Sequence, residues 1–173
     1  MFNTFYPDAY IASTYVINFE ELYEKGYRGI IFDVDNTLVP HGAPADKRAL
    51  DLFDRLRNIG FDTCLISNNQ EPRVKPFAEA VKSKYVFNAH KPSRKNYRKA
   101  MKLMGTDTNN TFFVGDQLFT DVWGAKRTGM KSILVKAIHP KEEIQIVLKR
   151  YLEKIVLYFY KRDKKSGKIK TGL

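Results

Sequence analysis

The chain has 173 residues, of which 43% are hydrophobic and 13% aromatic, a composition that excludes an intrinsically disordered protein and predicts one domain with its own core. Its formal net charge of +11 excludes a neutral surface and favours anionic partners, namely nucleic acid, anionic lipid or phosphorylated substrates. The single cysteine, Cys64, excludes an internal disulfide and is consistent with a reducing compartment.

Hydrophobic periodicity and turn residues predict helices and strands that alternate along the chain. The first helix begins at a capping pattern, with Asn18 as the cap and Glu21 three residues later, and it ends at Gly26. Apolar runs of strand length follow at residues 29–34, 61–67, 85–87, 111–114 and 132–135. Helical patterns lie between and after these runs, at residues 46–58, 72–80, 93–104, 121–128 and 142–160.

This alternation predicts the fold class. The predicted strands are almost continuously apolar, as parallel strands with both faces covered should be. Strands that alternate with helices are joined by right-handed crossovers, which produce a mostly parallel sheet. We therefore expect an α/β fold with a doubly wound parallel sheet in a single domain, residues 1–160, followed by a basic, flexible tail, residues 161–173.

Polar side chains follow the predicted strands at their carboxyl ends. In chain order they are Asp33, Asp35, Ser67, Asn68, Lys91, Asp116 and Asp121. In an open parallel sheet, ligands bind beyond the carboxyl ends of the strands, at the point where the strand order reverses. We therefore expect these side chains to meet in one crevice.

This set of residues suits phosphoryl transfer. Mg²⁺ prefers oxygen ligands, which Asp33 and Asp116 can supply from neighbouring strands. A carboxylate can also attack phosphorus and form an aspartyl-phosphate, provided that a metal and a cation such as Lys91 offset the negative charge. Asp35, two residues after Asp33, can protonate the leaving oxygen and later activate water.

Each of these residues also has an ordinary structural interpretation. Acids such as Asp33 often cap a helix or turn, and Asp121 can favour the dipole of a helix in its first turn. Ser67 can be a plain strand-end hydroxyl, and Lys91 can be solvated. It is their joint occurrence, in order and each near a strand end, that favours a site.

At these positions the chain resembles the haloacid dehalogenase (HAD) superfamily of phosphohydrolases. The motifs that carry the resemblance are Phe32-Asp33-Val34-Asp35-Asn36-Thr37-Leu38, Ser67, Lys91-Pro92, and Gly115-Asp116 with Asp121. The resemblance implies a Rossmann-like sheet with strand order 3-2-1-4-5. The switch point then falls between the first and fourth predicted strands.

The resemblance also implies a Mg²⁺ cofactor and a role for each residue. Asp33 is expected to be the nucleophile and a metal ligand. Asp35 is expected to be the general acid/base and to bind the metal through its backbone carbonyl. Asp116 is expected to be a further ligand, and Asp121 to support the metal shell through water. The phosphoryl group is expected to be bound by Ser67, Asn68 and Lys91.

The spacing of the motifs leaves no room for a cap domain. Residues 35–67 hold a short loop and one predicted helix, and residues 67–91 hold one helix and one strand. A folded insert would need roughly 50 residues or more. We therefore expect an open site that admits a phosphate carried by something large, and that excludes water poorly.

The wider pattern resembles the capless subfamily IIIA and, within it, the group that includes mitochondrial and bacterial phosphatidylglycerophosphate phosphatases. That resemblance implies phosphatidylglycerophosphate as the best expectation for the substrate. The same chemistry on another large substrate, a phosphoprotein or a nucleic acid end, is an alternative. A basic RNA- or ribosome-binding module with a vestigial phosphatase site is another, and the intact acids favour the enzyme over it.

The predicted C-terminal helix is amphipathic. Its apolar stripe consists of Ile144, Val147, Leu148, Tyr151, Leu152, Ile155, Tyr158 and Phe159, and the opposite face carries Lys149, Arg150, Glu153 and Lys154. The stripe either packs on the body of the protein, which is the common use of such a helix, or lies with the basic tail on an anionic membrane. No apolar run reaches the ~20 residues of a membrane span, and the N-terminus lacks the basic region of a secretory signal. We expect a cytoplasmic protein that can attach peripherally to the inner membrane face.

Overall fold

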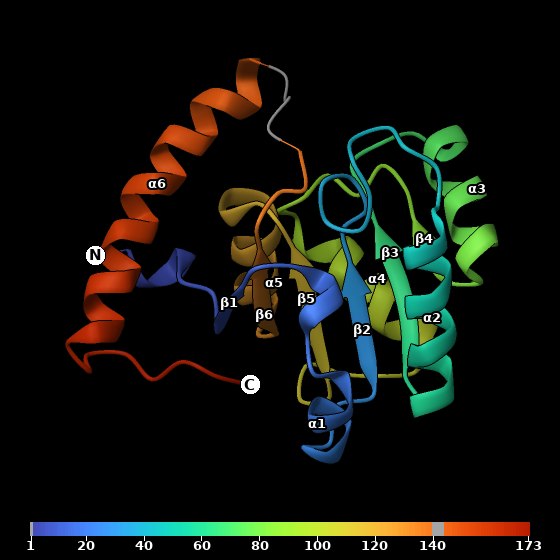
Figure 1. Cartoon of the computed structure of the whole chain (residues 1–173), viewed down its shortest axis with the longest axis horizontal. Coiled ribbons are helices and arrows are strands. Elements are labelled where there is room, and N and C mark those ends of the chain that lie inside the picture. The colour runs from blue at the N-terminus through green and yellow to red at the C-terminus, as the bar shows by residue number, and fades with distance from the viewer. Residues whose placement is uncertain (1, 140–143) are drawn as a thin grey trace.

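The computed structural model describes residues 2–139 and 144–173. Its centre is a six-stranded sheet in which every neighbouring pair of strands is parallel (Figure 1). The strands are β1 (Ala9–Ile11), β2 (Gly29–Phe32), β3 (Asp62–Ile66), β4 (Lys84–Val86), β5 (Thr111–Gly115) and β6 (Lys131–Val135), in the spatial order β1-β6-β5-β2-β3-β4. The predicted order of the five strands β2–β6 is therefore confirmed. The prediction missed β1, which pairs with β6 at the edge.

Helices cover both faces of this sheet. They are α1 (Phe19–Glu24), α2 (Lys47–Ile59), α3 (Glu71–Val81), α4 (Arg94–Met104), α5 (Trp123–Thr128) and α6 (Ile144–Lys165). One apolar cluster joins α1, α2 and α3 to the sheet, and a second joins α4 and α5 to its other face. Phe32 belongs to the first cluster and its neighbour Ile31 to the second, because successive strand residues point to opposite faces. This is the doubly wound α/β fold that the sequence predicts.

The connections between the strands that carry the motifs are short. Between β2 and β3 there is a loop and α2, and between β3 and β4 there is α3 (Figure 1). The expected absence of a cap domain therefore holds over these described segments.

The segment after β5 differs from the prediction of a helix over residues 121–128. A π-helical turn, Leu118–Val122, comes first, and α5 follows it directly. Asp121 therefore lies inside the π turn and not in the first turn of an α-helix. Its Oδ2 accepts a hydrogen bond from the Gln117 amide at 3.1 Å. Such wide turns are frequently found at functional sites.

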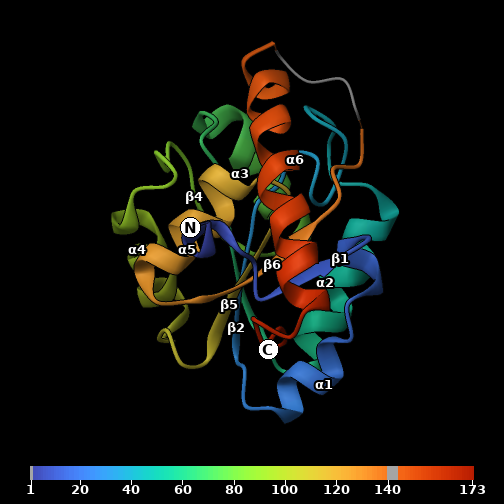
Figure 2. The same cartoon turned by 90° about the vertical axis from the view of Figure 1, so that its left-hand side faces the viewer.

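The helix α6 runs along the β1–β6 side of the sheet, and its first turn lies at the end where the strands lead into the polar residues (Figure 2). Val156 and Tyr160 pack it against Tyr6, Leu118 and Leu134. The predicted apolar stripe faces the other way: Leu148 is 68% exposed and Tyr158 66% exposed, and Val147, Tyr151, Leu152 and Ile155 are exposed as well. The interpretation that this stripe packs on the body of the protein is therefore wrong for these six residues.

The end of the chain also lies against the body. The helix α6 extends five residues beyond the predicted end at Tyr160, and Gly172 N–H donates a hydrogen bond of 2.8 Å to the Asp8 carbonyl. The Leu173 carbonyl accepts one from Lys25 Nζ at 3.0 Å. The division into a domain of residues 1–160 and a flexible tail of residues 161–173 stays a prediction.

Candidate active site

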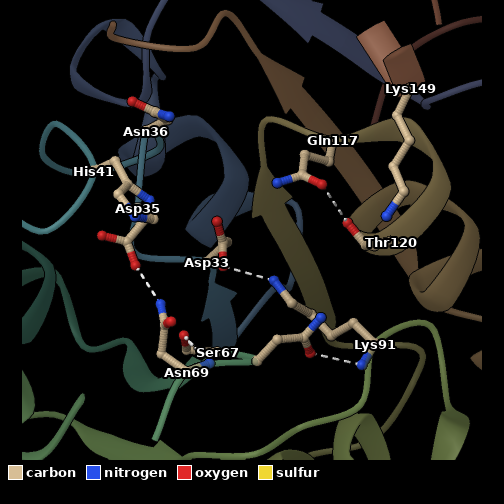
Figure 3. A pocket seen from close by; sticks show the side chains of 11 residues that line it. Asp33, Asp35, Asn36, His41, Ser67, Asn69, Lys91, Gln117, Thr120 and Lys149 are labelled. Atoms are coloured by element: carbon tan, nitrogen blue, oxygen red, sulfur yellow. Dashed lines mark hydrogen bonds and ion pairs between the residues drawn. The ribbon is translucent and has the colours of Figure 1, made fainter. Parts of the chain in front are cut away.

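The site lies at the switch point of the sheet. Strands β2 and β5 are neighbours in the sheet. The chain continues from β2 to β3 on one side of this pair and from β5 to β6 on the other side, which makes the point between β2 and β5 the switch point. Asp33 directly follows β2, and Asp116 directly follows β5. A cavity of about 210 Å³ opens at this point (Figure 3). Its lining residues are Asp33, Asp35, Asn36, His41, Ser67, Asn68, Asn69, Lys91, Gln117, Thr120 and Lys149.

Three buried carboxylates gather beside this cavity. Asp33, Asp116 and Asp121 each place one carboxylate oxygen so that all three atoms lie within 4.8 Å of one another. Thr37 Oγ1 lies between two of them, 3.1 Å from Asp116 Oδ1 and 3.4 Å from Asp33 Oδ2. Asp33 lines the cavity itself, whereas Asp116 and Asp121 are buried and do not line it.

Gly115 allows this approach of the acids. A Cβ atom at position 115 would lie only 2.4 Å from Asp121 Oδ2, a distance that no side chain could tolerate without moving the carboxylate. The glycine before Asp116 therefore makes room for Asp121.

Lys91 joins two of the carboxylates. Its ammonium donates to Asp33 Oδ1 at 2.6 Å (Figure 3) and to Asp121 Oδ1 at 2.7 Å, and its side chain is buried. Burial alone would lower the pKa of Lys91, but the charges of Asp121 and Asp33 outweigh it and raise the pKa. Lys91 is therefore a permanent positive charge in the floor of the site. Its backbone N–H is held by Asn68 Oδ1 at 2.7 Å.

The Asp35 carboxylate is fixed at the cavity wall by three donors. Its Oδ1 accepts hydrogen bonds from the Gly42 amide at 2.7 Å and from Arg73 Nη2 at 2.8 Å. Its Oδ2 accepts one from Asn69 Nδ2 at 2.7 Å. Asp35 lies on one side of Asp33 and Lys91 on the other (Figure 3). The buried hydroxyl of Ser67 lies below, where it accepts a hydrogen bond from the Asn69 amide at 3.1 Å.

The helix α6 supplies residues from its polar face, opposite the predicted apolar stripe. Arg150 Nη1 donates to the Asp116 carbonyl at 2.6 Å and to Glu153 Oε2 at 2.9 Å, and Arg150 Nη2 contacts Asp116 Oδ2. Glu153 Oε1 accepts a hydrogen bond from the Leu118 amide at 2.8 Å. Lys149 reaches the cavity from the same turn (Figure 3).

Other residues of the site were also missed. Gln117, just before the π turn, and Thr120, within it, line the cavity, so their position between Asp116 and Asp121 in the fourth motif was an available signal. His41 lines it from the loop after β2, where no pattern in the sequence singles it out.

The electrostatics of the site favour a divalent cation. Four buried carboxylates (Asp33, Asp116, Asp121 and Glu153) face two cations (Lys91 and Arg150), which leaves a formal charge of −2. Burial raises the pKa of Asp33 well above its usual range, and Asp121 and Asp116 add to this effect against the opposing charge of Lys91. Burial and Asp121 likewise raise the pKa of Asp116 to about 6, although Arg150 opposes the shift. An oxygen-only donor set with two excess negative charges fits a hard divalent cation.

Comparison with known proteins identifies relatives of this chain. A family model described as HAD-hydrolase-like matches residues 88–145. The chain is 34% identical over 159 residues to "Probable phosphatase YqeG" of Bacillus subtilis, which covers 91% of this chain and 92% of that protein. It is 24% identical over 171 residues to phosphatidylglycerophosphate phosphatase 1 of Arabidopsis thaliana, which covers 93% of this chain and 49% of that protein.

A solved structure supports the fold. The crystal structure of an uncharacterized protein from Listeria monocytogenes serotype 4b matches with a TM-score of 0.52 at 18% identity, over 67% of this chain and 84% of that chain. At this identity the match speaks for the fold alone. The B. subtilis relative spans nearly the whole chain, and the strand-end acids occupy the switch point of the sheet. The chain therefore belongs to the haloacid dehalogenase (HAD) family of hydrolases, among its phosphatases.

Proposed function

We propose that this protein is a Mg²⁺-dependent phosphomonoesterase that works through an aspartyl-phosphate on Asp33, with phosphatidylglycerophosphate as its substrate. The observation that carries the proposal is the position of the Asp33 carboxylate. It reaches the cavity from the end of β2, with the buried ammonium of Lys91 at 2.6 Å and two further buried carboxylates beside it. This combines a nucleophile, a fixed positive charge and a cation site at one point.

The reaction then follows from the residues. Asp33 attacks phosphorus, the bond from phosphorus to the leaving oxygen breaks, and Asp35 gives that oxygen its proton. Asp35 next takes a proton from water, which attacks the phosphorus of the aspartyl-phosphate and releases inorganic phosphate with Asp33 regenerated. Lys91 holds its positive charge beside Asp33 throughout. Bound Mg²⁺, held by Asp33 and Asp116, would supply further positive charge to offset the phosphoryl oxygens.

The proposed metal dependence gives a direct prediction. Treatment with EDTA should abolish phosphate release, and added Mg²⁺ should restore it, because the excess negative charge of the site would otherwise repel the substrate. Ca²⁺ should inhibit, since it takes 6–8 ligands at 2.3–2.6 Å instead of a compact octahedral shell. Circular dichroism of the EDTA-treated protein is the control for folding. Full activity in EDTA would contradict Asp33 and Asp116 as a shared cation site.

Two features support a large anionic substrate. The described segments around the site form no cap, and Lys149 adds a cation to the cavity wall beyond the residues proposed to bind the transferred phosphate. The name of the A. thaliana relative points to phosphatidylglycerophosphate, which carries a second phosphate group next to the one removed.

The test is a phosphate-release panel with Mg²⁺. It compares phosphatidylglycerophosphate in mixed micelles with a phosphopeptide, a 5′-phosphorylated oligonucleotide and glyceraldehyde 3-phosphate. The lipid should give the highest kcat/KM, and Lys149→Ala should raise KM for the lipid while leaving the smallest substrate unaffected. A higher kcat/KM for the phosphopeptide or the oligonucleotide would move the proposal to that substrate class.

We also propose an anionic membrane surface as a partner. No helix in the described part of the chain is long and apolar enough to cross a bilayer. The exposed stripe of α6 is followed by exposed basic residues, Lys161, Arg162, Lys164, Lys165, Lys168 and Lys170. Apolar residues beside cations are the combination that binds an anionic interface, at ~1 kcal/mol for each basic residue near the surface.

Vesicle cosedimentation at low salt tests this partner. The protein should bind vesicles that contain phosphatidylglycerol, release them as salt is raised, and bind phosphatidylcholine vesicles weakly. Leu148→Ser with Tyr151→Ser, and separately Lys164→Glu with Lys165→Glu, should each weaken binding. Leu103→Ser and Lys99→Glu, which change exposed residues of α4, are the matched controls. Equal binding to both kinds of vesicle would contradict this proposal without affecting the phosphatase chemistry.

A further inference from the structure

The two carboxylate oxygens of Asp116 face different neighbours. Oδ1 lies 3.1 Å from Thr37 Oγ1, which is itself 3.4 Å from Asp33 Oδ2, so this oxygen is on the side of the proposed cation site. Oδ2 faces the opposite way and contacts Arg150 Nη2. The side chain of Asp116 is therefore held in one orientation between α6 and the nucleophile.

The guanidinium of Arg150 is placed to enforce that orientation. Arg150 Nη1 donates to the Asp116 carbonyl at 2.6 Å while Nη2 contacts the carboxylate of the same residue. A planar fork that spans the backbone and the side chain of one residue restricts rotation of that side chain more strictly than the rotatable ammonium of a lysine would.

Arg150 is itself anchored. Its Nη1 also donates to Glu153 Oε2 at 2.9 Å, and Glu153 Oε1 accepts from the Leu118 amide at 2.8 Å. Leu118 begins the π turn that carries Asp121. Through Arg150 and Glu153, one turn of α6 is therefore bonded both to Asp116 and to the start of the π turn that follows it.

We propose that Arg150 is a positioning residue of the active site, which orients Asp116 so that Oδ1 is presented to the Mg²⁺ ion of the proposed function. Two effects of the guanidinium oppose each other: its positive charge repels a cation, and its hold on Asp116 prepares a ligand. Partners that orient metal ligands typically contribute about 10–100-fold in metal affinity or activity. The guanidinium is held on Oδ2 and not on the oxygen beside Thr37, and the proposal requires its orienting effect to outweigh its repulsion.

The experiment measures Mg²⁺ binding to the substrate-free protein by calorimetry, together with kcat and KM at saturating Mg²⁺. Arg150→Ala should weaken Mg²⁺ binding and lower kcat, each by about 10-fold or more. Arg150→Lys keeps the charge but not the fork, and it should show most of the same loss. Arg98→Ala, which removes an exposed arginine of α4, is the matched control and should bind Mg²⁺ like the wild type. Circular dichroism checks folding. If Arg150→Ala proves to be unfolded, the measurements on Arg150→Lys test the proposal instead.

The outcomes separate this proposal from the proposed function. A wild-type protein that binds Mg²⁺ and releases phosphate, with Arg150→Ala unchanged in both, would overturn the positioning role alone. Tighter Mg²⁺ binding by Arg150→Ala with undiminished kcat would also overturn it, because the guanidinium would then merely compete with the cation. Full activity of Arg150→Lys would show that charge suffices without orientation. A wild type that neither binds Mg²⁺ nor releases phosphate would overturn both proposals together.

Discussion

Asp33→Asn should lower the turnover number by about 10⁴-fold or more, the scale of loss seen when a covalent nucleophile is removed. The amide of asparagine is a poor nucleophile towards phosphorus, so the aspartyl-phosphate cannot form. The substitution also removes one of the three carboxylates that could hold a cation. Phosphate release with Mg²⁺, measured on the purified variant, checks this result.

The same variant should remain folded. Burial raises the pKa of the Asp33 carboxyl, so its ionised form is disfavoured in the folded protein, and a neutral amide removes that penalty at pH 7. Lys91 keeps its partner Asp121 at 2.7 Å. Urea unfolding in EDTA should give an unchanged or higher free energy of unfolding. Asp51→Asn, which breaks only an exposed pair with Lys47, is the control for both measurements. Activity of Asp33→Asn within tenfold of the wild type would remove Asp33 from the role of nucleophile.

The central sheet could be predicted because its strands carry strong signals. Strands β2 and β5 are buried on both faces and read as unbroken apolar runs, and each leads directly into an acid. Strand β1 could not be found in this way. It has three residues, all only partly buried, and its pairing with β6 depends on how the N-terminal segment crosses the edge of the sheet.

The orientation of α6 is the part of the fold that the sequence left open. Helical periodicity identifies an apolar and a polar face, but it does not say which face meets the protein. Here Arg150 and Glu153 face inward, where Arg150 pairs with the Asp116 carboxylate just after β5 and Glu153 accepts from the Leu118 amide at the start of the π turn. Those partners are distant in the sequence, so no local pattern could reveal them.

The candidate site also has one group of residues that the sequence predicts and another that it does not. Its acids, Ser67 and Lys91 follow strands whose carboxyl ends must meet at one edge of a parallel sheet, which made their convergence predictable. The groups that orient them come from loops and helices. Arg73 reaches Asp35 from α3, and Arg150 reaches Asp116 from α6. Their contacts depend on the packing of these helices, which the sequence pattern does not specify.

Asp35→Asn should lower turnover of an alkyl phosphate ester by about 10²–10⁴-fold, the usual contribution of a general acid–base residue. Asparagine has nearly the same shape, and its Oδ1 can still accept from the Gly42 amide and from Arg73, so the cavity wall should keep its structure. The Asn69 side chain, which donates to Asp35 Oδ2, can turn its amide to meet the new NH₂ group. The loss should therefore report the missing proton transfer and not a collapsed site.

The choice of leaving group distinguishes this role from simple positioning. p-Nitrophenolate leaves without a proton, so Asp35→Asn should still be phosphorylated on Asp33 by p-nitrophenyl phosphate, whereas hydrolysis of the aspartyl-phosphate should be slow because water has lost its base. Stopped-flow measurement should then show a burst of p-nitrophenolate that matches the enzyme concentration, and intact-mass spectrometry should detect the phosphorylated chain. Asp54→Asn, an exposed acid of α2, should show neither. Equal losses with the alkyl and the p-nitrophenyl ester, without a burst, would mean that Asp35 only shapes the cavity and that another group moves the proton.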